Sequence, residues 1–82
     1  MDDVQKWVQL VADELGVSGS IELAALLKIT RDVAHQVARP AAPLTTYVIG
    51  TAMAGGVDMA TVSAAVQRCL DEWAAANPAP AE

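Results

Sequence analysis

Four helix-breaking points divide this chain of 82 residues into short segments. The breaks are the stretch "GVSGS" at residues 16–20, Arg39-Pro40, Gly55-Gly56 and Asn77-Pro78. Between them, apolar residues recur every three or four positions, as in amphipathic helices, and no segment alternates apolar and polar residues as a strand does. Alanine, at 17 residues, favours closely packed helices. We therefore predict an all-α protein, a small four-helix array or bundle with short connections. The expected organisation is a single helical domain at 1–77 and a flexible tail at 78–82.

Three of these segments have one apolar side, which we expect to face a shared core. The first is expected to follow Asp2 or Asp3, either of which can cap a helix, and to end at Gly16. The second is expected over about residues 21–38, and the fourth from Asp58 to residue 77.

Two tryptophans and the single cysteine lie on these apolar sides. Trp7 belongs to the stripe of the first segment and Trp73 to that of the fourth. Both are expected to anchor the core, with the alternative that one of them faces a partner. Cys69 shares the stripe of Trp73 and is expected to be a small core residue and not a reactive thiol. One cysteine also excludes an internal disulfide.

The third segment has almost no polar side. Pro43 is expected to be its first helical residue, because the missing N–H costs nothing there, and Gly55-Gly56 is expected to end it. Nearly all of its residues are apolar, including Leu44, Tyr47 and Val48. We therefore predict that this is the central and most buried helix.

Charge limits the partners of this chain. Ten acidic residues against five lysines and arginines give a net charge of −5, which repels nucleic acid. No apolar run approaches the roughly 20 residues of a membrane span. The acidic start "MDDVQKW" also lacks the apolar core of a signal peptide. We expect a cytoplasmic protein that binds neither nucleic acid nor a membrane.

Size adds a further expectation. A chain of this length buries only about 60% of the surface that it exposes when unfolded, so its core is marginal. Because 54% of its residues are hydrophobic, we expect it to form a homodimer or to dock on a partner.

One stripe of the second segment concentrates the basic residues. At 100° per residue, Lys28, Arg31, His35 and Arg39 lie within about 80° of one another, roughly opposite the apolar side. Guanidinium groups bind phosphate or carboxylate in a bidentate manner, and a protonated histidine also donates. This pattern indicates a candidate anion site.

The turn after this stripe adds further donors. If the third helix begins at Pro43, its cap position falls on Ala42, which has no side-chain oxygen. The first amides of that helix would then need water, a ligand, or the hydroxyl of Thr45 or Thr46. Our candidate ligand- or partner-binding residues are therefore Arg31, His35, Arg39, Thr45 and Thr46.

A simpler interpretation of the same residues stays open. Basic residues near a helix C-terminus favour the helix dipole, and Lys28 has the spacing to pair with Asp32. On this interpretation the stripe is only the solvated side of an amphipathic helix.

Catalytic and metal-binding patterns are absent from the sequence. There is no phosphate-binding GxxxxGK[ST], no GxGxxG after a strand, and no histidine- or cysteine-rich metal spacing. We expect no catalytic residue, no metal and no cofactor, and therefore not an enzyme.

The stretch "RDVAHQVARPAAPLTTYVIG" at residues 31–50 resembles the signature of a small bacterial helical domain of unknown function. The preceding "LAALLKIT" and the N-terminal "VQKWVQLVADELGV" fit its pattern, so the resemblance covers most of residues 1–75. Members of that family look like stand-alone short proteins or C-terminal extensions of molybdenum cofactor guanylyltransferases. The resemblance implies association with molybdopterin-guanine dinucleotide biosynthesis. It does not imply transferase activity, since the strands and the glycine-rich loop of that enzyme are missing here.

Two functional classes follow. The first is a non-catalytic accessory or interaction module of molybdenum cofactor biosynthesis, with the guanylyltransferase or a phosphorylated pterin as partner. The second is a plain helical oligomerisation or structural domain without a small-molecule ligand.

Overall fold

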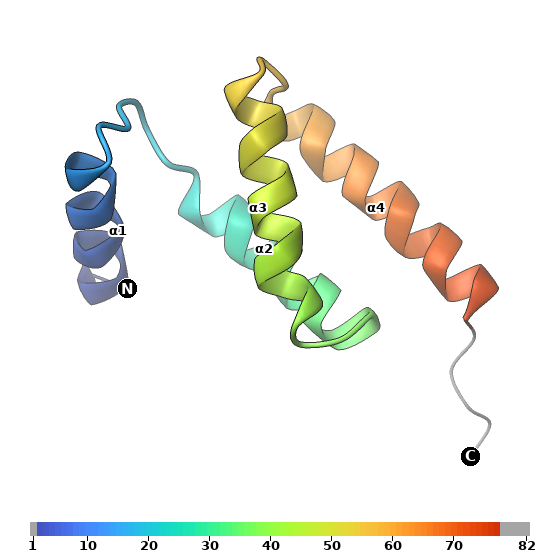
Figure 1. The fold of residues 1–82 in the computed structure, drawn as a ribbon. Helices are drawn as coiled ribbons and strands as arrows, with labels where there is room; N and C mark the ends of the chain where they lie inside the picture. Colours follow the sequence, from blue (N-terminus) through green and yellow to red (C-terminus); the bar gives the residue numbers. More distant parts are fainter. Residues whose placement is uncertain (1, 78–82) are drawn as a thin grey trace.

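The protein consists of four α-helices, as seen in a computed structural model that describes residues 2–77 (Figure 1). They are α1 (Asp2–Glu14), α2 (Leu23–Gln36), α3 (Ala41–Ala54) and α4 (Met59–Ala76). Within the described residues there is no strand. The predicted all-α class and the number of helices are therefore confirmed, whereas the tail predicted at 78–82 lies outside the described residues.

The core is formed by three of these helices. α2, α3 and α4 pack against one another, whereas α1 has no comparable contact with any of them. The six buried residues of the central cluster come from all three packed helices: Ile29 and Val33, Ile49, and Met59, Val62 and Leu70. Burial of these apolar side chains stabilises the helices, because helices in proteins gain most of their stability from the packing of an apolar side.

Local sequence explains where the helices begin and end. α1 and α3 each end in a Schellman motif around a glycine with positive φ, Gly16 at 71° and Gly56 at 107°. Asp58 caps α4, because its carboxylate accepts a hydrogen bond of 2.8 Å from the backbone N–H of Thr61. Hydrogen bonds from the hydroxyl and the backbone N–H of Thr61 hold the pKa of Asp58 below its ordinary value.

α1 lies to one side of the three packed helices, beside the N-terminal end of α2 (Figure 1). Its apolar stripe is largely uncovered, and the Trp7 side chain is 64% exposed. The prediction that Trp7 anchors the core is therefore wrong. The spacing of apolar residues shows that a helix has an apolar side, but it does not show which surface covers that side.

α3 is not the most buried helix, contrary to the prediction. Only Ile49 is buried, whereas Leu44, Tyr47 and Val48 are 70%, 76% and 65% exposed. The reason is that α2 and α4 cover one side of α3, and α1 does not cover the other. α3 therefore presents an apolar outer side to solvent.

α4 differs from its prediction in the same way. Leu70 and Val62 are buried, but Cys69 and Trp73 are exposed. The interpretations of Cys69 as a core residue and of Trp73 as a core anchor are therefore wrong. The C-terminal half of α4 contributes only part of its apolar side to the core, and the remainder borders an open groove.

Candidate functional site

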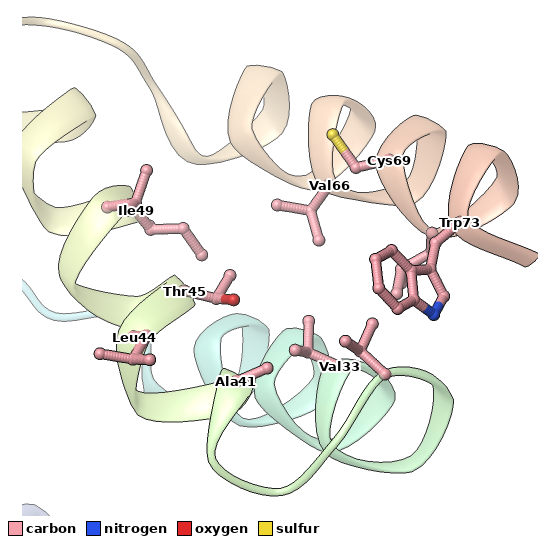
Figure 2. Close-up of a pocket in the computed structure, with 11 residues that line it drawn as sticks. Val33, Ala41, Leu44, Thr45, Ile49, Val66, Cys69 and Trp73 are labelled. Carbon is pink, nitrogen blue, oxygen red and sulfur yellow. The ribbon is translucent and has the colours of Figure 1, made fainter. Parts of the chain in front are cut away.

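Side chains from α2, α3 and α4 line an open apolar groove with a volume of about 440 Å³ (Figure 2). We call it the α2–α4 groove. It is lined by Val33 and Val37 of α2 and its following turn, by Ala41, Leu44, Thr45, Val48 and Ile49 of α3, and by Val66, Cys69, Leu70 and Trp73 of α4.

The groove lies at the corner where the chain turns from α2 into α3. α2 ends at Gln36, residues 37–40 form the turn, and α3 begins at Ala41. The last turns of α2 and the first turns of α3 therefore form one end of the groove, and the second half of α4 forms the opposite wall (Figure 2). Val33, Ile49 and Leu70 are shared with the core, so the groove is an opening onto it.

The chemistry of the groove is almost entirely apolar. None of its lining residues is charged, and the polar side-chain groups among them are the Thr45 hydroxyl, the Cys69 thiol and the Trp73 indole N–H. Covering these apolar side chains with another apolar surface is favourable, because it removes them from water. It offers few partners to a charged ligand.

The basic residues predicted as an anion site lie on exposed surface. Arg31 and His35 are exposed on α2, and Arg39 is exposed in the turn that follows. Among the side-chain hydrogen bonds between described residues, none involves these three side chains. Lys28 instead pairs with Asp32 at 2.9 Å, as its spacing indicated. The anion-binding role of Arg31, His35 and Arg39 stays a prediction.

The start of α3 does not supply the expected free amides. α3 begins at Ala41 with Pro40 at the cap position, and not at Pro43 with Ala42 as the cap. The N–H groups of Ala41 and Ala42 donate to the carbonyls of Ala38 and Arg39, at 3.0 and 3.1 Å. Pro43 is the third helical residue and has no N–H to leave unpaired. The corner therefore keeps its basic side chains but lacks the backbone donors that we predicted.

The two threonines of the predicted site face different surroundings. Thr45 lies among the apolar residues of the α2–α4 groove (Figure 2). The Thr46 hydroxyl donates to the carbonyl of Ala42 at 2.9 Å, so its proton is used within the helix. Thr45 is thus a groove residue, and its placement does not depend on a helix start.

Sequence reasoning missed the groove itself. The signal was the third segment, which lacks a polar side, but we interpreted that property as complete burial. The same composition also arises when one side of a helix packs on a core and the other binds a partner. Which side of α3 is buried and which is exposed depends on where α1 lies, and the sequence does not show the position of α1.

Within residues 2–77, no three histidine, cysteine, aspartate or glutamate side chains are grouped so that they could hold a metal ion. No helix in this range is long and apolar enough to cross a membrane.

The fold and the groove define a small all-α domain with an exposed apolar groove. Residues 1–78 match the family described as Domain of unknown function (DUF6457), and the chain belongs to this family. Comparison with curated proteins and comparison with solved structures found no match. The family assignment confirms the resemblance to a domain of unknown function and carries no link to molybdenum cofactor enzymes.

Proposed function

We propose that this protein is a non-catalytic interaction module that binds a helix of another polypeptide through the α2–α4 groove. The observation that supports this proposal is the continuity of exposed apolar surface. Leu44 and Val48 line the groove and are also largely exposed, so they extend it onto the outer side of α3. Apolar surface of this kind on a small domain marks a site of association.

A helix suits this groove better than a small polar molecule does. Its volume of about 440 Å³ is in the range of ligand pockets. Such pockets, however, orient a ligand with several well-placed polar groups, and a phosphorylated pterin carries charges that need partners. The groove offers only the hydroxyl, thiol and indole groups named above. An amphipathic helix needs apolar contact along its length, which this groove provides.

A proposed association with molybdenum cofactor biosynthesis rests on the resemblance of residues 31–50 to the family signature. On this proposal the partner is a molybdenum cofactor guanylyltransferase, and the groove takes an apolar helix of that enzyme. The alternative, a plain oligomerisation domain, uses the same surface. A second ligand class, phosphate-bearing pterins, is supported only by the exposed Arg31, His35 and Arg39, which have no side-chain partner among the described residues.

The experiment places a photo-cross-linking amino acid at Val48 in the full-length chain expressed in its native cell. A matched control carries the same amino acid at Gln67, which is exposed on α4 and does not line the groove. We expect cross-links to a defined polypeptide from position 48 and none from position 67. Binding of that polypeptide is then measured with purified proteins, comparing wild type with Val48→Glu. If position 48 cross-links no polypeptide, including a second copy of this chain, the proposed function is wrong.

A further inference from the structure

We infer that the occupant of the α2–α4 groove is α1 of a second copy, so that two chains form a dimer by exchanging their N-terminal helices. The inference rests on the proposed function, because it names the partner of the same groove. Two observations carry it: the uncovered apolar side of α1 and the surface area of the single chain.

α1 has the side chains that such a groove would accept. Val4, Trp7, Val8 and Val11 stand at positions i, i+3, i+4 and i+7, which is the spacing of the anchors by which an amphipathic helix binds in a groove. Val4 and Trp7 are exposed, as is Leu10 one turn after Trp7. α1 has 13 residues and is therefore about 20 Å long. Its apolar side remains open because the rest of its own chain does not cover it.

The surface of the single chain is too large for a folded monomer of its mass. It amounts to 6330 Å² for 8.5 kDa. A compact chain of that mass exposes about 4,650 Å², so the excess is about 1,700 Å². The six terminal residues outside the described range account for at most about 900 Å² of this even if fully exposed. The remainder, at least about 800 Å² per chain, equals what one partner buries in a stable interface of standard size.

The segment between α1 and α2 permits the exchange. Residues 15–22 separate the two helices, and Gly16 and Gly19 both have positive φ. Figure 1 shows α1 beside the N-terminal end of α2, away from the corner between α2 and α3 where the groove lies. Exchange of an element between identical chains needs only a change in such a connection, since every contact surface is already present in each copy.

Charge does not oppose this pairing. Residues 2–14 carry four carboxylates and one lysine, a net charge of −3. Residues 23–76, which include the three helices that line the groove, carry four lysines and arginines and four carboxylates, a net charge of 0. The acidic α1 of one copy therefore meets a neutral body in the other, and the apolar contacts decide the pairing.

Sedimentation equilibrium of the full chain measures the association directly. We expect a monomer–dimer equilibrium for wild type, weakened at least tenfold by Trp7→Glu and by Val48→Glu. Gln9→Glu makes a change of the same charge on the polar side of α1 and is the control that should dimerise as wild type does. Circular dichroism of each variant establishes that its helices are intact, so that lost association is not lost folding.

Disulfide trapping then tests the exchange itself, because Cys69 lies in the groove and is the only native cysteine. In Leu10→Cys, oxidation by an added disulfide such as oxidised glutathione is expected to join the introduced thiol on α1 to Cys69 of the partner subunit. The product is a covalent dimer that a reductant reverses. Wild type and Gln9→Cys are controls and should form little of it. A bond that closes within one chain instead would show that α1 folds back on its own groove, and the inference would be wrong.

The outcomes separate this inference from the proposed function. A chain that stays monomeric at high micromolar concentration, yet cross-links a different protein from position 48, overturns the exchange and retains the interaction module. A monomeric chain that cross-links nothing overturns both.

Discussion

Two leucines of the same size test the division of this molecule into a core and an exposed apolar surface. Leu70 on α4 is only 4% exposed and belongs to the central cluster, whereas Leu44 on α3 is 70% exposed. Replacing each with alanine removes the same atoms from opposite environments. The burial therefore predicts two very different losses in the free energy of unfolding.

The magnitudes follow from the burial. Leu70→Ala loses the transfer free energy of a buried side chain and leaves a cavity, at a cost of about 3 to 5 kcal/mol. Leu44 keeps only about a third of its surface covered, so Leu44→Ala should cost less than about 1 kcal/mol. Alanine also has a slightly better helix propensity than leucine, which reduces this cost further. A domain of this length has a total stability of only about 4 to 12 kcal/mol, so the first substitution removes a large part of it.

Urea unfolding monitored by circular dichroism measures both losses. The chain must be at low micromolar concentration, because dimer formation would add stability by mass action. An unchanged m-value shows that the variants unfold from the same structure. Similar losses for Leu44→Ala and Leu70→Ala at low concentration would mean that the outer side of α3 is covered within a single chain. The groove and the inference drawn from it would then fail together.

Three other predictions address local features. Gly50→Ala should stabilise the protein by about 0.5 to 1 kcal/mol in thermal unfolding, because a Cβ at this helical position meets no atom within 4 Å. A loss of stability would reveal a close neighbour. Asp58→Ala should lower the melting temperature at neutral pH. Because the pKa of Asp58 is lowered by folding, its cap stabilises the protein above the ordinary value of 3.8 and is lost as the pH falls through the folded pKa. The difference between Asp58→Ala and wild type should therefore shrink in acid, and a constant difference would contradict the cap. The double substitution Arg31→Ala, Arg39→Ala should weaken phosphate-bearing pterins or guanine nucleotides in calorimetry if the basic stripe is an anion site. Equal binding by a folded variant would make the stripe a solvated helix surface.

The helices were predictable because their limits are set by local chemistry. Gly16, Gly56 and Asp58 act through hydrogen bonds to residues within one turn, which the sequence shows directly. The start of α3 was placed two residues too late, because Pro43 is tolerated anywhere in a first turn, where amide protons have no helical acceptor.

Burial was harder to predict because it depends on how helices meet. Trp7, Tyr47 and Trp73 are large aromatic residues of the kind that often fill a core, but all three are exposed. Periodicity identified the apolar sides but not the number of surfaces available to cover them. Ile29 and Met59 are buried instead, because they belong to the central cluster of the three packed helices. The sequence predicted a candidate site at a basic corner, whereas the structure shows an apolar groove. The groove could not be predicted because it depends on how the helices meet.

Charge gives the two functional classes opposite responses to salt. Binding of a phosphate group by exposed arginines weakens as salt rises, since a Debye length of about 10 Å at 0.1 M screens such contacts. Two copies of a chain with a net charge of −5 repel each other over longer distances, and moderate salt removes that repulsion first. The apolar contacts of the groove are not weakened by salt. We therefore expect dimer formation to strengthen between low and moderate salt in sedimentation experiments. Dimer formation that weakens steadily over this range would mean that charge pairs and not the apolar groove hold the two copies together.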